Sequence, residues 1–161
     1  MSEIKVRTAS IADIRAIREL MPQLYDYYGI SFNEKRFEWG IKKRLKDRLQ
    51  REGILDAENI TEVGKSFIVG LLVAEILVNP VCEGEARITA IVVNNQYRNK
   101  GVGHFLVENA IEHLEKMGAE VIKLDLEEEF IKILPYFKNM GFRSRYRVLI
   151  YTPDQIKKKD N

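Results

Sequence analysis

The most constraining feature of this sequence is an apolar strand that leads, through a short polar loop, into two closely spaced glycines at the start of a helix. The strand covers residues 88–93, and the loop ends in Arg98-Asn99-Lys100-Gly101-Val102-Gly103. Gly101 and Gly103 let the backbone adopt positive φ and approach a ligand closely. Unpaired N–H groups and the positive end of the helix dipole meet there. The segment therefore predicts an anion site that suits a pyrophosphate, with Arg98 and Lys100 adding charge-assisted contacts.

Hydrophobic periodicity over the rest of the chain predicts a mixed α/β fold. Alternating apolar residues predict strands, and apolar residues three or four positions apart predict helices. The predicted strands cover residues 4–8, 59–63, 66–78, 86–93, 120–126 and 145–151, and the predicted helices cover residues 11–24, 34–51, 102–117 and 130–140. The order β-α-α-β-β-β-α-β-α-β is typical of one α/β domain with a central, twisted α+β mixed sheet. We assign this domain to residues 1–152 and a charged C-terminal tail to residues 153–161.

Two local signals refine the helix boundaries. Ser10 followed by Asp13 is close to a capping box and predicts the start of the first helix. Pro135 predicts that the helix over residues 130–140 is kinked or starts late, because proline disrupts a helix interior.

Charge and composition exclude several functional classes. The chain has 26 Lys and Arg residues against 24 Asp and Glu residues, a net charge of +2, which is too balanced for extensive nucleic-acid binding. The most apolar stretch, residues 67–78, contains Glu75 and is too short to cross a bilayer, and no apolar signal segment follows Met1. Cys82 has no partner for an intrachain disulfide, and two histidines with one cysteine show no metal-ligand spacing. We expect a cytoplasmic monomer or homodimer that binds no metal, membrane or nucleic acid.

Two other phosphate-binding motifs fit the sequence poorly. The dinucleotide fingerprint requires a glycine where this chain has Leu106. The triplet Gly64-Lys65-Ser66 ends like a P-loop, but Asn59 replaces its first glycine and a strand follows instead of a helix.

The segment around the two glycines resembles the signature of the GNAT superfamily of N-acetyltransferases. That signature is Gln or Arg-x-x-Gly-x-Gly or Ala between a strand and a helix, and it is matched by Arg98, Gly101 and Gly103. The late helix of the family ends in Gly-Phe, which is matched by Gly141-Phe142. The element order is similar over residues 4–151, nearly the whole chain.

The resemblance implies that acetyl-CoA binds as co-substrate in a cleft between the strand that ends at Val93 and the strand over residues 120–126. Ile91, Val92 and Val93 would contact the pantetheine arm, with the backbone groups of Ile91 and Val93 pairing with it like an added strand. The pyrophosphate would be held by backbone amides of Asn99, Lys100, Gly101, Val102, Gly103 and His104. The amine would attack the thioester directly, with no covalent enzyme intermediate.

The sequence departs from the family pattern at the residues that move protons. Many members have a tyrosine where this chain has Phe137, and Tyr136 lies one residue earlier, a rotation of about 100° around a helix. The glutamate base of the histone-modifying branch corresponds by spacing to Arg87, and an asparagine of the late helix corresponds to Phe130.

Acetylation of an amine requires a base and a donor to the oxyanion and is helped by an acid, and the sequence offers candidates for each. The ammonium must lose a proton, and the base candidates on or beside central strands are Glu75, Glu85, Asp125 and Glu127. The backbone N–H of Val93 is the candidate donor to the oxyanion. Tyr136 is the candidate acid, although a thiolate leaves readily without one because the thiol pKa lies near 8.5.

The sequence therefore predicts an N-acetyltransferase that transfers an acetyl group from acetyl-CoA to a primary amine. The acceptor classes left open are a protein N-terminus, a lysine, a polyamine and another small amine. The alternative is a non-catalytic acyl-CoA-binding sensor, favoured by Phe137 and Arg87. A nucleic-acid-binding domain built on the basic helix over residues 42–51 is opposed by the charge balance.

Overall fold

The computed structural model describes residues 3–78, 80–81, 83–145, 147–151 and 153. Strands and helices follow the predicted order from the first strand to the fourth helix. In chain order they are β1 (Glu3–Thr8), α1 (Ile14–Tyr27), α2 (Glu34–Lys46), β2 (Ile54–Ile60), β3 (Ser66–Leu77), β4 (Glu85–Val93), α3 (Val102–Lys116), β5 (Val121–Leu124) and α4 (Leu134–Asn139). The chain divides into two compact units, and the division falls between Asp125 and Leu126 in the sequence.

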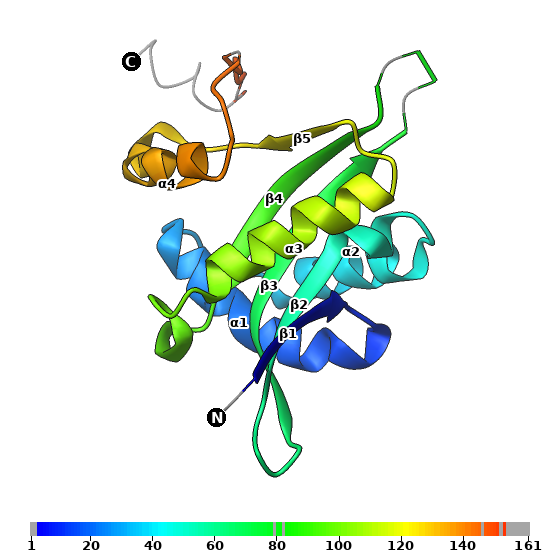
Figure 1. Ribbon diagram of the computed structural model, residues 1–161, viewed down its shortest axis with the longest axis vertical. Helices are drawn as coiled ribbons and strands as arrows, with labels where there is room; N and C mark the ends of the chain where they lie inside the picture. Colours follow the sequence, from blue (N-terminus) through cyan, green and yellow to red (C-terminus); the bar gives the residue numbers. More distant parts are fainter. Residues whose placement is uncertain (1–2, 79, 82, 146, 152, 154–161) are drawn as a thin grey trace. The chain divides into compact units, whose positions relative to one another are not determined.

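The first unit is built on a five-stranded mixed sheet with the order β1-β2-β3-β4-β5 (Figure 1). Neighbouring strands from β1 to β4 are antiparallel, and β4 and β5 are parallel. A parallel pair requires a crossover, and α3 supplies it. The predicted fold class is confirmed.

Helices cover both faces of this sheet, and alternate residues of β3 show which face each helix covers. Leu71 packs in a cluster with Ile17 of α1 and Leu45 of α2. Gly70, the preceding residue, faces α3, where a Cβ would lie 2.8 Å from Leu106 Cδ1. The absence of a side chain at position 70 therefore lets α3 pack closely against the sheet.

The second unit contains α4, which begins where proline permits. Pro135 lies in the first turn of the helix, and a 3₁₀ segment, Glu128–Ile133, precedes it. The helix therefore starts late, one of the two outcomes predicted from Pro135. Phe137 packs edge-on against Tyr136 and Phe142, with ring centroids 5.1 and 5.8 Å apart.

Two predicted boundaries between α2 and β3 are wrong. The helix predicted over residues 34–51 ends at Lys46, because the Asp47 carboxylate accepts hydrogen bonds from the N–H groups of Leu49 and Gln50 and starts a new turn. The strand predicted over residues 59–63 is β2, which begins at Ile54 and ends at Ile60. The apolar alternation breaks at Asp56, a buried carboxylate, so the pattern concealed the true start of the strand.

The final predicted strand, residues 145–151, is not formed by its described residues, 145 and 147–151. The apolar side chains from Val148 to Tyr151 are exposed, and an extended segment without a strand partner has little stability in water. Cys82 and residues 154–161 of the predicted tail lie outside the described residues. No helix in the described part of the chain is long and apolar enough to span a membrane.

Candidate functional site

The sheet opens between β4 and β5, and this opening defines the candidate site (Figure 1). β5 pairs with residues 85–88 of β4, and the last pair is Ile88 with Leu124. Residues 90–93 continue to pair with β3 on the other side. Thr89 lies at a register shift, where its Oγ1 donates to the Val73 carbonyl at 3.2 Å. One edge of β4 beyond Ile88 therefore has no strand partner among the described residues.

The backbone groups of Ile91 and Val93 point toward this free edge. The Asn94 N–H donates to the Val69 carbonyl at 2.8 Å, so Asn94 is directed toward β3. Successive residues of a strand direct their backbone groups to opposite sides, and the register is regular from Ala90 to Val93. The Val93 carbonyl accepts from Arg98 Nε at 3.0 Å, which fits this direction. The predicted contacts of Ile91 and Val93 with an extended ligand therefore have the required orientation.

The first turn of α3 lies beside the end of β4. A Cβ on Gly103 would lie 3.6 Å from Val93 Cγ2. Gly101 is the N-cap with φ of 81°, and Phe105 N–H makes the first helical bond, to the Gly101 carbonyl at 3.0 Å. Val102 and Gly103 precede that bond, so the helix offers no acceptor for their N–H groups. The positive end of α3 and the free edge of β4 therefore form one continuous site.

Hydrogen bonds from two distant elements hold the loop that leads into α3. Gln23 Oε1 of α1 accepts from the Asn95 N–H at 2.9 Å, and Asn59 Nδ2 of β2 donates to the Tyr97 hydroxyl at 3.0 Å. Sequence reasoning missed Gln23 and Asn59. The signal for Asn59 was present, because asparagine is uncommon within strands and this one is buried.

The side chains of the predicted phosphate loop are partly engaged with the protein. Arg98 holds the Val93 carbonyl, and Lys100 Nζ lies 5.4 Å from the centroid of the Tyr97 ring. His104 Nε2 lies 3.0 Å from Glu108 Oε1, one turn along α3. The His104 ring is therefore directed along the helix toward Glu108.

Three of the four base candidates lie around Arg87, near the point where β4 and β5 separate. Glu75 stands opposite Arg87 in the β3–β4 register. Glu85 Oε1 and Asp125 Oδ2 each lie 3.8 Å from an Arg87 nitrogen. Glu127, the fourth candidate, belongs to the second unit.

Two of these carboxylates also hold a closer cation. Arg44 Nη2 of α2 donates to Glu75 Oε1, and Lys123 Nζ lies 2.5 Å from Glu85 Oε2. Asp125 is the most exposed of the three, with 58% of its side-chain surface accessible. Asp125 directly follows Leu124, so it stands at the opening itself.

The carboxylates and Val93 lie at opposite ends of the free edge. Arg87 and Val93 are six residues apart in β4, which corresponds to about 20 Å of strand. Val93, the predicted oxyanion donor, and Arg87, around which three predicted bases lie, therefore occupy different positions along β4.

In α4, the two aromatic residues at the predicted acid position differ in burial. Phe137 is 6% exposed, whereas Tyr136 is 40% exposed. This difference agrees with the rotation of about 100° between successive helical residues.

The sequence matches the family model described as the acetyltransferase (GNAT) family over residues 15–142. The chain belongs to the GNAT acetyltransferase family. The predicted resemblance is therefore confirmed. No curated protein matches the sequence.

Solved structures share the GNAT fold at low sequence identity. A possible acetyltransferase from Clostridium difficile 630 has a TM-score of 0.75 and 18% identity, with 92% of this chain and 97% of that chain covered. The aminoglycoside acetyltransferase AAC(6')-Iy, in complex with a bisubstrate analogue of CoA, has a TM-score of 0.74 and 17% identity, with 94% of this chain and 98% of that chain covered. Glucosamine-6-phosphate N-acetyltransferase from Arabidopsis thaliana has a TM-score of 0.65 and 20% identity, with 94% of this chain and 99% of that chain covered.

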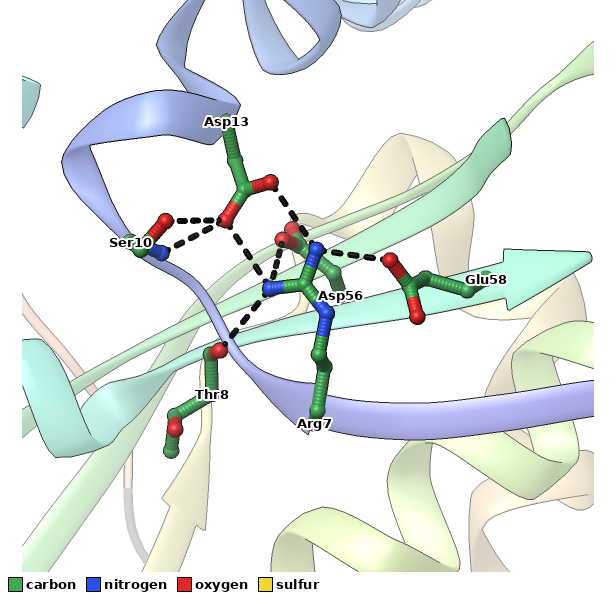
Figure 2. A network of polar contacts seen from close by, with 6 residues as sticks. All are labelled: Arg7, Thr8, Ser10, Asp13, Asp56 and Glu58. Atoms are coloured by element: carbon green, nitrogen blue, oxygen red, sulfur yellow. Dashed lines mark hydrogen bonds and ion pairs between the residues drawn. The ribbon is translucent and has the colours of Figure 1, made fainter. Parts of the chain in front are cut away.

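Away from the opening, this GNAT protein has a polar network centred on Arg7 of β1 (Figure 2). The Arg7 guanidinium donates two hydrogen bonds of 2.9 Å to Asp13 and one of 2.7 Å to Glu58. Its Nη1 also lies 3.6 Å from Asp56 Oδ2. The network therefore joins β1 and β2 to the 3₁₀ turn before α1, where the Ser10 N–H donates to Asp13 as the capping signal predicts.

Asp56 is the unusual member of this network. Its side chain is fully buried, and neither carboxylate oxygen accepts a hydrogen bond from the described residues. Burial, and next the charge of Asp13, raise the pKa of Asp56 to about 7, although Arg7 opposes the shift. In contrast, the hydrogen bonds from Arg7 lower the pKa of Asp13 to about 2. We interpret the network as a structural connection, because its contacts link elements of the fold.

Replacing Asp56 by asparagine is expected to change the pH dependence of stability. The folded protein binds a proton at Asp56 more tightly than the unfolded chain, so ionisation of this carboxyl opposes folding. This penalty is absent below about pH 4, grows as pH rises toward 7, and is complete above it. The difference between the ordinary pKa of 3.8 and the pKa of about 7 in the folded protein corresponds to at most about 4 kcal/mol of unfolding free energy. Urea unfolding should show that the stability of Asp56→Asn relative to the wild type increases between pH 4 and pH 8. If the stabilities of the two proteins changed with pH in parallel, the raised pKa of Asp56 would be contradicted.

Proposed function

We propose that this protein transfers an acetyl group from acetyl-CoA to a primary amine. The observation that carries the proposal is the contact between the first turn of α3 and the end of β4, with Gly103 against Val93. The helix end suits a pyrophosphate, and the free edge of β4 suits the amide groups of a pantetheine arm. Both binding surfaces are continuous, as one extended ligand with an anionic end requires. The similar structures include N-acetyltransferases of an aminoglycoside and of an amino sugar phosphate.

The length of the pantetheine arm places the reacting thioester along β4. The extended arm spans about four residues of strand. With the pyrophosphate at Gly101 and Gly103, the arm runs from Val93 back toward Thr89, where β5 joins β4. We therefore assign the N–H of Val93 to the arm and the N–H of Ile91 to the oxyanion of the tetrahedral intermediate. Both point toward the free edge.

Asp125 is the base that this placement favours. It follows the last paired residue of β5, its side chain is largely exposed, and its nearest cationic atom, on Arg87, is 3.8 Å away. Glu75 and Glu85 hold Arg44 and Lys123 more closely and serve mainly to position those cations. Asp125 accepts the ammonium proton directly or through one water molecule, and the neutral amine then attacks the thioester.

The Tyr136→Phe variant is expected to keep its turnover within about twofold of the wild type. A thiolate leaves without a dedicated acid because its conjugate thiol has a pKa near 8.5. The Tyr136 ring packs edge-on against Phe137 and is retained in the variant. Steady-state kcat with saturating acetyl-CoA tests this expectation, and a tenfold loss would instead assign the acid role to the Tyr136 hydroxyl.

Thiol release tests the proposed activity directly. The protein, acetyl-CoA and a panel of primary amines are mixed, and free CoA is followed with a thiol reagent. Amine-dependent CoA release, with acetylated amine identified by mass spectrometry, is the expected result. The second candidate function, a non-catalytic acyl-CoA sensor, is favoured by Arg87 and Phe137 at the family's proton-transfer positions. It predicts saturable CoA binding without turnover on any amine.

A further inference from the structure

Arg87 has the least satisfied guanidinium near the opening between β4 and β5. Among the described residues it donates no hydrogen bond, and its Nε is buried without a partner. Its two carboxylate neighbours lie at 3.8 Å, beyond hydrogen-bond distance. Arg7 provides an internal comparison, because its side chain is equally exposed, at 36% against 37%, yet it makes hydrogen bonds of 2.7–2.9 Å to two carboxylates.

The cluster around Arg87 leaves this cation available. Glu75 is hydrogen-bonded to Arg44, and Glu85 is closest to Lys123. Asp125, the remaining carboxylate, is 58% exposed and contacts Arg87 only loosely. A planar guanidinium with unused donors matches the two oxygens of a carboxylate or a phosphate.

Arg87 and Asp125 also occupy the position where an acceptor must enter. Arg87 belongs to the second-last pair of the β4–β5 ladder, and Asp125 directly follows the last pair. A cation and an anion therefore stand side by side where the proposed thioester lies. Such a pair is complementary to a molecule that carries an oxyanion and an ammonium close together.

We infer that the acceptor is an amine bearing a carboxylate, of the amino-acid type, whose carboxylate binds Arg87 while its ammonium approaches Asp125. This inference rests on the proposed function and specifies its substrate class. The reaction stays balanced: the N–C bond to the acetyl group forms, the C–S bond breaks, CoA leaves as the thiolate, and Asp125 takes the ammonium proton. Arg87 holds the substrate and moves no proton.

Matched pairs of amines, with and without the carboxylate, test the inference. Lysine against cadaverine and phenylalanine against phenethylamine are suitable pairs. The wild type should have a lower KM for the carboxylate-bearing member, and Arg87→Met should reduce kcat/KM for that member by about tenfold or more. The same variant should reduce kcat/KM for the amines without a carboxylate by much less, because it removes only a cation 3.8 Å from Asp125 in that case. The KM for acetyl-CoA should stay close to the wild-type value. Arg87→Lys should recover part of the loss.

Controls separate the inference from a structural role and from failure of the proposed function. Arg15→Met removes an arginine whose side chain is 86% exposed and should change neither member of a pair. The inference would be overturned if Arg87→Met lowered kcat/KM equally for both amines of a pair. It would also be overturned if the wild type showed no preference for the amine that bears the carboxylate. Neither result would contradict the proposed acetyltransferase activity. Arg87→Met could instead lose activity selectively with succinyl-CoA and an amine without a carboxylate. Arg87 would then bind the carboxylate of the acyl group, and this result would also overturn the inference.

If no amine is acetylated, the proposed function fails, and binding then decides the inference separately. Calorimetry with the CoA-bound protein should show that phenylalanine binds more tightly than phenethylamine, and that Arg87→Met removes the difference. Equal affinities of the two compounds for the CoA-bound wild type would overturn the assignment of Arg87 as a carboxylate site.

Discussion

The Gly103→Glu variant is expected to bind coenzyme A at least about a hundredfold more weakly than the wild type, with little change in fold. The new carboxylate would lie at the first turn of α3, beside Val93, where the pyrophosphate is proposed to bind. Two like charges then compete for the same N–H groups, and the longer side chain also blocks the approach of the coenzyme to the backbone. Titration calorimetry with coenzyme A measures the loss, and circular dichroism checks the fold.

Gly103→Ala is the matched control for this experiment. Its Cβ would meet Val93 Cγ2 at 3.6 Å, an ordinary contact, so the alanine variant should fold and retain most of its affinity. Gly101 is less suitable, because its φ of 81° makes any side chain there strained. Unchanged affinity in a folded Gly103→Glu protein would remove the pyrophosphate from α3 and with it the basis of the proposed function.

The Arg7→Met variant should lose about 3 kcal/mol of unfolding free energy, the largest loss of stability that we predict. The substitution leaves three carboxylates, Asp13, Asp56 and Glu58, without their shared cation, and Asp56 is fully buried. Water reaches part of the Arg7 side chain, so the lower end of the range for broken buried pairs applies. Urea unfolding at neutral pH measures the change.

Two further variants isolate the cause of that loss. Arg15→Met removes an exposed arginine 3.9 Å from Glu19 and should cost about 0.5 kcal/mol or less. Adding Asp56→Asn to Arg7→Met should restore part of the stability, because the buried group left without its cation no longer ionises. If Arg7→Met costs no more than Arg15→Met, the network has no special role in the fold.

Local patterns were sufficient to predict the strand and the helix that form the candidate site. Strand 86–93, the two glycines and the amphipathic helix after them are adjacent in sequence, so each signal reports on the same piece of backbone. The structure places them as expected, with β4 over Glu85–Val93 and α3 over Val102–Lys116. The late start of α4 followed from Pro135 for the same reason, since proline acts on its own turn.

Residues that act across long sequence separations were not predictable in this way. Gln23 and Asn95 are 72 positions apart, and Arg7 and Glu58 are 51 apart. The sequence around each of these residues does not specify which distant residue it contacts. Asp56 shows the opposite problem, because a buried carboxylate breaks the apolar alternation and hides a strand that the sheet nevertheless forms. The distance between Val93 and the carboxylates likewise required the register of β4 with β5.

The two hydrogen bonds that fix the loop before α3 have a thermodynamic consequence for whatever ligand that loop holds. Gln23 and Asn59 order residues 95–97 when the chain folds, so the entropy of arranging this loop is lost at that stage. Association with a ligand then proceeds on a rigid surface and retains more of its favourable free energy. We therefore expect affinity at the start of α3 to depend partly on side chains that belong to α1 and β2.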